Sequence, residues 1–266
     1  MTTGALIFAY NNEAVDYLSL AQWSARNIQR HLNIPTAVVT DRPEANNMLE
    51  FACVVNETTD NDNHRYFHEY RNTLTWYNGN RLDAYRLSPW DQTLVLDADY
   101  VVASNQLLTV LESSRNFLAH RWARDITGVS DFVGNNYFGN YRMPMWWATV
   151  MMFRRSAEAQ RIFATMNMVK QNWTHYRNLY SNNHKSFRND HALSIALNLA
   201  NGNNPDYPGI PWDLASMLPN TKIKQLDTDR FRLEYTLPDG RPKYIVIQNQ
   251  DLHVMEKQQL GDIIAG

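Results

Sequence analysis

A chain of 266 residues, 44% of them hydrophobic, is long enough for a substantial core in one large domain or two small ones, and this composition excludes disorder over most of its length. The single cysteine, Cys53, excludes an intrachain disulfide and a cysteine-based zinc site, and the net charge of −2 argues against strong nonspecific DNA affinity. No run is long enough to span a membrane and no signal peptide is visible, so we expect a cytoplasmic protein without a membrane partner.

The N-terminal segments predict a β-α-β unit. Ala5–Ala9 is a short apolar strand, an apolar helical stripe runs from Tyr17 to Ile28, and Thr36–Thr40 is a second strand that ends at Asp41. This spacing indicates a nucleotide-binding type of sheet. The chain has no Gly-x-Gly-x-x-Gly and no Walker loop, so it supports neither a dinucleotide-binding fold nor a kinase-like NTPase.

Two aspartates follow the best strand signal in the chain. Thr93–Leu96 is apolar on both faces, as in a buried parallel strand, and Asp97 and Asp99 come directly after it. Ligands bind at the carboxyl ends of strands in open α/β sheets, and paired carboxylates at such a point usually hold a cation. Hard oxygen ligands favour Mg²⁺ or Mn²⁺, so the pair predicts a metal–diphosphate site. Its alternative is a pair of turn or capping residues.

Further elements are expected along the rest of the chain. Residues 63–87 are expected to be helical, and the later elements are a strand at Val150–Phe153, helices at Ala157–Val169 and His191–Leu199, and a strand at Tyr244–Ile247.

The stretch Asn140–Asp190 differs from the rest in charge. It carries eight Lys or Arg and two acids, a charge of +6, whereas the remainder carries −8. It also contains Trp146, Trp147, Trp173, Tyr176 and Tyr180. Basic and aromatic residues together are typical of binding to an anionic polymer with bases. A solvated helix face over core aromatics is the more common origin of such a composition.

The order of these segments resembles glycosyltransferases of the single-sheet, metal-dependent type (the GT-A fold), especially family 8. The resemblance covers most of the chain and is carried by Ala9-Tyr10-Asn11, Thr40-Asp41, Arg81 upstream of Asp97-Ala98-Asp99, Arg188-Asn189-Asp190-His191-Ala192-Leu193, and His253 with Lys257. The segments Ser88-Pro89-Trp90-Asp91, Trp147-Ala148-Thr149 and Arg188-Asn189-Asp190 resemble still more closely glycosyltransferases of tailed phages, some of which modify 5-hydroxymethylated bases in DNA.

This resemblance implies a fold and a reaction. The fold is α/β, with a single mixed, mainly parallel sheet flanked by helices and a C-terminal loop that closes over the donor. One catalytic domain would cover residues 1–266, with a nucleotide-sugar-binding half at 1–104 and an acceptor-binding half at 105–266. The enzyme would use Mn²⁺ or Mg²⁺ to move glucose or a pentose such as arabinose from a UDP-sugar to a hydroxyl. For the phage subgroup that hydroxyl is the 5-hydroxymethyl group of cytosine in DNA, modified in the host cytoplasm.

The resemblance also implies roles for particular residues. Asp97, Asp99 and His253 would hold the metal, and Lys257 would contact a phosphate, although Gln258-Gln259 stand where the family often has Pro-Trp. The donor-binding set would be Ala9, Tyr10, Asn11, Asp41, Arg81, Asp97, Ala98, Asp99 and Lys257. Core packing is the alternative for Tyr10, a turn role for Asp41, and a surface helical position for Arg81. For Asp97 the alternative is a contact to the ribose, and for His253 it is an exposed position in the C-terminal tail. Arg86 is the second candidate for the role of Arg81.

Two further carboxylates are candidate catalytic residues. Asp190 would act as base toward the acceptor hydroxyl or as a stabiliser beside the anomeric carbon, with a first-turn helix acid as its alternative. Asp125 would contact hydroxyls of the donor sugar. Trp146, Trp147 and Arg188 would bind the acceptor.

Other functions remain open at this point. The acceptor could be a saccharide, lipid or protein, or the chain could be a non-catalytic nucleotide-sugar-binding protein. A two-metal nuclease has less support, because such sites normally need further acidic ligands nearby.

Overall fold

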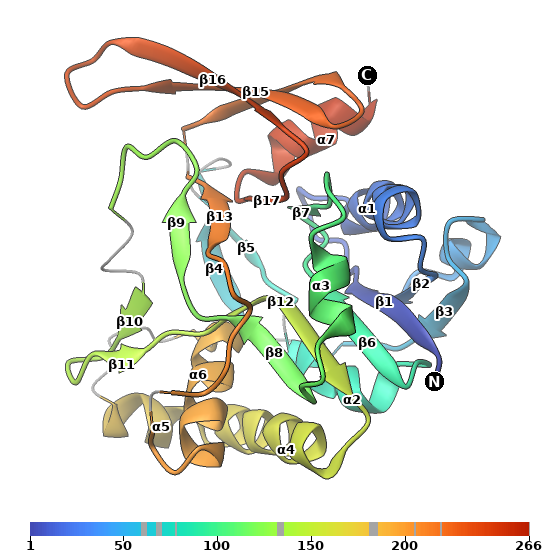
Figure 1. Cartoon of the computed structure of the whole chain (residues 1–266), viewed down its shortest axis with the longest axis vertical. Helices are drawn as coiled ribbons and strands as arrows, with labels where there is room; N and C mark the ends of the chain where they lie inside the picture. Colours follow the sequence, from blue (N-terminus) through green and yellow to red (C-terminus); the bar gives the residue numbers. More distant parts are fainter. Residues whose placement is uncertain are drawn as a thin grey trace.

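A six-stranded sheet forms the centre of the computed structural model, which describes residues 1–59, 63–67, 71–77, 79–131, 136–180, 186–204, 206–218 and 220–265 (Figure 1). The strand order is β3-β2-β1-β6-β12-β8. The strands are β1 (Thr3–Phe8), β2 (Thr36–Thr40), β3 (Cys53–Asn56), β6 (Gln92–Leu96), β8 (Phe117–His120) and β12 (Trp147–Arg154). β12 runs antiparallel to both of its neighbours, and the other pairs are parallel. The predicted α/β class with a mixed, mainly parallel sheet is confirmed.

Helices flank this sheet (Figure 1). They are α1 (Tyr17–Leu32), α2 (Ala84–Leu87), α3 (Leu107–Glu112), α4 (Ala157–Gln171), α5 (Trp173–Leu179), α6 (Asn189–Ala200) and α7 (Lys257–Ala265). Side-chain caps fix two of the helix starts, because Asp16 accepts from the Ser19 amide at 3.1 Å and Ser156 accepts from the Ala159 amide at 3.2 Å. Among the described residues, no helix is both long and apolar enough to cross a membrane.

The prediction of a helix over residues 63–87 is wrong. The segment contains an antiparallel hairpin of β4 (His64–Phe67) and β5 (Asn72–Thr75), followed by the 3₁₀-helix η2 (Gly79–Asp83) and the short α2. The segment carries Arg65, Arg71, Arg81 and Arg86, and charged residues give little periodicity information. Thr73 and Thr75 are β-branched residues that favour an extended backbone. The other predicted helices and strands are present within a few residues of their expected bounds.

A second sheet brings distant parts of the chain together. Its order is β7 (Tyr100–Val101), β17 (Leu252–Val254), β13 (Leu214–Met217) and β9 (Ala123–Asp125). Tyr100 pairs with His253, His253 pairs with Ser216, and Ser216 pairs with Asp125. This register carries the C-terminal part of the chain to the end of β6, where the aspartate pair lies.

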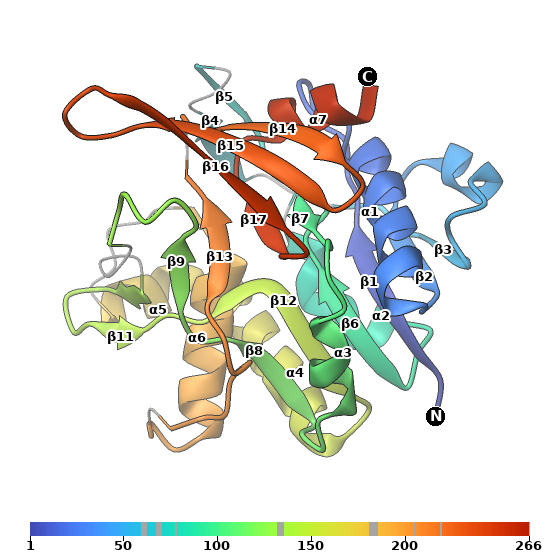
Figure 2. The same cartoon turned by 45° about the horizontal axis from the view of Figure 1, so that its top comes forward.

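Short antiparallel elements complete the fold. β14 (Lys222–Asp227), β15 (Arg230–Thr236) and β16 (Pro242–Gln248) form a three-stranded sheet across the top of Figure 1, and β10 (Tyr137–Phe138) pairs with β11 (Met143–Pro144). Figure 2 shows β17 descending from this sheet between β13 and β7. After this sheet the chain returns through β17 to the second sheet, beside the aspartates.

A buried histidine in β8 predicts a loss of stability in acid. Burial lowers the pKa of His120 to about 4, although its Nδ1–H donates to the Trp212 carbonyl at 3.0 Å. The unfolded chain therefore takes up a proton near pH 6.5 that the folded chain takes up only near pH 4, so stability falls as the pH drops through this window. The full effect is about 3 kcal/mol. Denaturant unfolding at several pH values measures the free energy of unfolding, which should fall less steeply between about pH 6.5 and 4 in His120→Asn than in the wild type. An equal pH dependence in the two proteins would show that His120 is not the cause.

Candidate metal and donor site

The backbone fixes both aspartates at the end of β6. The Asp97 amide donates to the Thr149 carbonyl on β12 at 3.0 Å, and the Tyr100 amide donates back to the Asp97 carbonyl at 3.1 Å. This closes a turn that places Asp99 just before β7. Since β7 pairs with β17, the Val254 amide donates to the Asp99 carbonyl at 3.0 Å. His253 thus comes to the aspartates through strand pairing.

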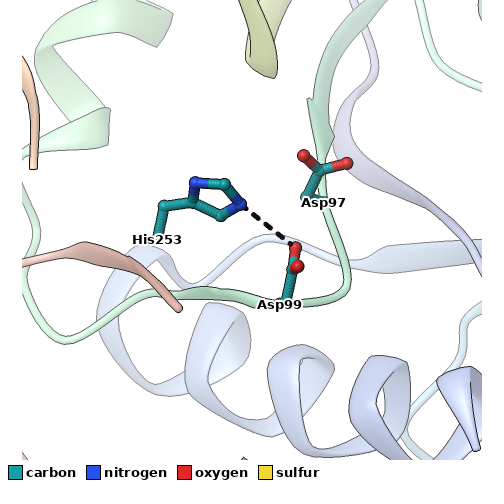
Figure 3. A group of neighbouring side chains, drawn as sticks. All are labelled: Asp97, Asp99 and His253. Atoms are coloured by element: carbon teal, nitrogen blue, oxygen red, sulfur yellow. Dashed lines mark ion pairs between the residues drawn. The ribbon is translucent and has the colours of Figure 1, made fainter. Parts of the chain in front are cut away.

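Three side chains converge at this point (Figure 3). Asp97, Asp99 and His253 each offer one ligand atom, and these atoms lie within 4.8 Å of one another. The His253 ring turns its Nε2 toward the Asp99 carboxylate, 3.6 Å from Oδ1. Two carboxylate oxygens and one imidazole nitrogen are a donor set that fits Mn²⁺ or Mg²⁺. The cluster could therefore hold a divalent cation, as the sequence predicts.

Two cationic side chains neutralise the aspartates. Lys257, the first residue of α7, places Nζ 2.6 Å from Asp99 Oδ2, and Arg81 on η2 forms an ion pair with Asp97. Burial alone would raise the pKa of Asp99, but the charge of Lys257 outweighs it and holds that pKa well below its usual range. This favours the ionised form of Asp99, which is the form that binds a cation.

Gln258 and Gln259, which follow Lys257, lie in the first turn of α7. Gln259 anchors this helix on the start of β14, because its Oε1 accepts from the Ile223 amide at 2.9 Å and its Nε2 donates to the Thr221 carbonyl at 3.1 Å. A groove of about 1200 Å³ lies between α1, β14 and α7, and none of the cluster residues lines it.

Asp190 is connected to the Arg81–Asp97 pair through the backbone of one residue, Ala148. Arg81 donates to the Ala148 carbonyl at 3.3 Å, and the Ala148 amide donates to Asp190 Oδ1 at 2.9 Å. Arg188 binds the other oxygen, Oδ2, at 2.9 Å. Burial would raise the pKa of Asp190, but the charge of Arg188 and the Ala148 amide keep it below its usual range. The start of β12 thus connects the candidate metal ligands with the candidate catalytic carboxylate.

The remaining predicted donor residues differ in their surroundings. Tyr10 is buried, which raises the pKa of its phenol to about 12, and its oxygen accepts from Asn80 at 3.1 Å. Asn11 instead stabilises the start of α1, since its side chain accepts from the Leu18 amide at 2.9 Å. Asp41 is exposed at the end of β2. The two alanines, Ala9 and Ala98, are buried.

Asp125 organises a loop with both of its oxygens. Oδ1 accepts from the Thr127 amide at 3.0 Å, and Oδ2 accepts from the Thr127 hydroxyl at 2.7 Å and from the amides of Val129 and Ser130 at 3.0 Å. A carboxylate engaged in four hydrogen bonds has little capacity left for a sugar hydroxyl. In this structure Asp125 therefore shapes the loop that follows β9.

Removal of the Asp125 charge should loosen that loop. In Asp125→Asn one oxygen becomes an NH₂ group that faces amide donors, so we expect the free energy of unfolding to fall by about 1–3 kcal/mol. Chemical denaturation measures the change, with Asp131→Asn, an exposed acid of the same loop, as the matched control. Equal effects of the two substitutions would show that the Asp125 hydrogen bonds contribute nothing specific.

The predicted acceptor residues are not arranged as a binding surface. Trp146 and Trp147 are only 3% and 8% exposed, so in this structure neither ring offers a face to a base. The apolar burial of both rings explains their presence without a ligand. The guanidinium of Arg188 is directed at Asp190. Two other arginines of the basic stretch bind main-chain carbonyls, Arg154 those of Arg115 and Leu111, and Arg155 those of Tyr85 and Ser88.

Sequence reasoning missed three contributors to this site. They are Asn80, which binds the Tyr10 phenol, Ala148, which joins Arg81 to Asp190, and Ser216, whose hydroxyl lies 3.0 Å from His253 Nδ1. Ala148 acts through its backbone and leaves no signal in the sequence. Ser216 does leave a signal in the sequence, because it is a polar residue within the otherwise apolar run Leu214–Met217.

Comparisons with known proteins find partial similarity. No protein-family model matches the chain, and no curated protein matches it. The glycosyltransferase GlyE of Streptococcus pneumoniae TIGR4 is similar over 79% of this chain and 46% of its own, at 15% identity and a TM-score of 0.44. The galactosyltransferase LgtC, solved with donor and acceptor sugar analogs, is similar over 72% of this chain and 70% of its own, at 13% identity and a TM-score of 0.43.

The extent of this similarity is limited. This chain spans less than half the length of GlyE. At such identities and TM-scores, nothing about the activity of this chain follows from either protein.

Proposed function

We propose that this protein is a metal-dependent glycosyltransferase that moves a sugar from a UDP-sugar to a hydroxyl group. The observation that carries the proposal is the convergence of Asp97, Asp99 and His253 at the end of a central strand, with Arg81 and Lys257 paired to the two aspartates. A cation site with two further positive side chains suits a diphosphate, which needs compensation for more than one negative charge.

Charged side chains of this site would stabilise the charges that develop during such a transfer. A bound divalent cation would neutralise charge growing on the departing diphosphate as the sugar becomes oxocarbenium-like. Lys257 and Arg81 would bind diphosphate oxygens in exchange for part of their present contacts with Asp99 and Asp97. Asp190 carries its charge next to Arg81 and would stabilise positive charge on the sugar.

Two further residues support a nucleoside site less directly. Tyr10, two residues after the end of β1, would contact the base, because its phenol accepts a hydrogen bond from Asn80, the neighbour of Arg81. Asp41, exposed at the end of the adjacent strand, would accept from uracil N3–H or from a ribose hydroxyl.

For the acceptor we propose the 5-hydroxymethyl group of cytosine in DNA. The support is the resemblance of the sequence to phage enzymes and the charge of +6 on the stretch Asn140–Asp190. Three basic side chains of this stretch already bind groups within the protein, namely Arg154, Arg155 and Arg188. Contacts to DNA phosphates would therefore come from other basic residues of the stretch, such as the exposed Arg161 on α4.

Turnover with defined donors and acceptors tests both parts of this proposal. The protein is incubated with Mn²⁺ and a panel of nucleotide sugars, and release of nucleoside diphosphate is measured with hydroxymethylated DNA and with the same DNA unmodified. We expect release from a UDP-sugar that requires the hydroxymethyl group and stops with EDTA.

Other outcomes separate the alternatives. Turnover with a saccharide, lipid or peptide but not with hydroxymethylated DNA would end the DNA acceptor and leave the glycosyltransferase. Donor binding without release in any combination would identify a nucleotide-sugar-binding protein.

A further inference from the structure

We propose that Ser216 is the positioning residue that prepares His253 to bind the metal. This inference rests on the metal site of the proposed function and assigns a role to a residue outside the ligand set. Ser216 Oγ lies 3.0 Å from His253 Nδ1, and on the other side of the ring Nε2 faces the aspartates. The histidine is therefore held from the side opposite to the cation position.

Strand pairing brings the serine to the histidine. Ser216 on β13 pairs with His253 on β17, and its own carbonyl accepts from the Ile126 amide at 3.0 Å. The position of the hydroxyl is thus fixed by main-chain bonds on both sides of β13. Ser216 is 1% exposed, so water has little access to replace its hydroxyl.

The chemistry of imidazole gives this contact a consequence. A neutral histidine carries one N–H, and only its bare nitrogen can coordinate a metal. Ser216 Oγ can accept from Nδ1–H at 3.0 Å, whereas the 3.6 Å between Nε2 and Asp99 Oδ1 is longer than a hydrogen bond. An Nδ1–H held by Ser216 leaves the lone pair of Nε2 directed into the group formed with Asp97 and Asp99. Partners of this kind fix the tautomer and orientation of metal-binding histidines.

Three substitutions and Mn²⁺ alone test the role of Ser216. Ser216→Ala removes the acceptor and should weaken Mn²⁺ binding by about tenfold or more, measured by calorimetry and by the electron paramagnetic resonance of free Mn²⁺. Ser216→Thr keeps the hydroxyl and should restore most of the affinity. The matched control is Ser24→Ala, because Ser24 is a buried serine in α1 whose hydroxyl has no hydrogen-bond partner among the described residues.

A second readout needs no metal. Nitrogen-15 NMR of the histidine rings, with His253 assigned by comparison with His253→Gln, distinguishes a protonated ring nitrogen from a bare one. We expect a protonated Nδ1 and a bare Nε2 in the wild type and in Ser24→Ala. In Ser216→Ala this preference should be lost, whereas a change in packing alone would leave the tautomer as it is.

The outcomes separate this inference from the proposed function. Wild-type Mn²⁺ affinity in Ser216→Ala, or an equal loss in Ser24→Ala, would overturn the role of Ser216. A wild-type protein that binds no Mn²⁺ would overturn the metal site and this inference with it. A protein that binds Mn²⁺ with the expected dependence on Ser216, yet releases no nucleoside diphosphate from any sugar donor, would uphold this inference and end the proposed transfer.

Discussion

Asp99→Asn should lower Mn²⁺-dependent sugar transfer by about three orders of magnitude. The substitution removes a charged ligand of the cation. A cation stabilises the charge on a departing diphosphate by several kcal/mol, and about 1.4 kcal/mol corresponds to a factor of ten in rate. Release of nucleoside diphosphate at saturating donor measures the change, and excess EDTA should produce a similar loss in the wild type. Full activity in EDTA would remove the metal from the reaction.

The same substitution should also destabilise the protein. Sequence alone suggests that Asp99→Asn leaves the fold intact, but Asp99 is buried and bound to Lys257 at 2.6 Å. Without the carboxylate, the ammonium of Lys257 stays partly buried beside a neutral amide, and breaking a buried pair in this way costs up to about 3–5 kcal/mol.

A double substitution separates stability from catalysis. Asp99→Asn combined with Lys257→Met removes both charges, so the free energy of unfolding should recover in part while transfer stays lost. Lys257→Met alone is the control for the missing ammonium. Recovery of transfer in the double variant would show that Asp99 acts only as the partner of Lys257 and holds no metal.

The central sheet and the aspartate pair could be predicted because their signals are local. The strands β1, β2 and β6 are five or six residues long and buried, and each contains an apolar run of at least three residues that can be recognised in one sequence. The carboxyl-end rule then places Asp97 and Asp99 at a ligand site without any knowledge of their neighbours.

The arrangement of the rest of the site depends on elements too short to recognise. β7, β9 and β17 are two or three residues long, and periodicity cannot identify such strands. His253 could therefore be suggested only through the family resemblance, and Ser216 was not suggested at all. Both positions are set by pairing between segments far apart in the chain.

Charge and aromatic content indicate an interface less directly, for a different reason. Composition does not reveal what a side chain contacts, and here the guanidinium groups of Arg154 and Arg155 bind main-chain carbonyls while the rings of Trp146 and Trp147 are in the core. An interface prediction needs exposure, which depends on the whole fold.

Asp190→Asn should lower transfer by about two to three orders of magnitude, with little change in donor affinity. The carboxylate is held by the Ala148 amide and by Arg188, each at 2.9 Å, and its pKa lies below the usual range. A group with a low pKa is a poor general base at neutral pH, so a fixed negative charge beside the sugar explains its position better. Because a lowered pKa means protonation only in acid, kcat should not depend on Asp190 ionisation between about pH 5 and 8.

The pH profile and the partner of Asp190 decide between the two roles that the sequence leaves open. A rising limb of kcat near neutral pH that disappears in Asp190→Asn would identify a general base instead. Arg188→Ala adds a second discrimination. If Arg188 binds the acceptor, the substitution should raise the KM for hydroxymethylated DNA alone. If it acts through Asp190, as their ion pair implies, kcat should fall as well, because the charge of the buried carboxylate is then no longer held in place.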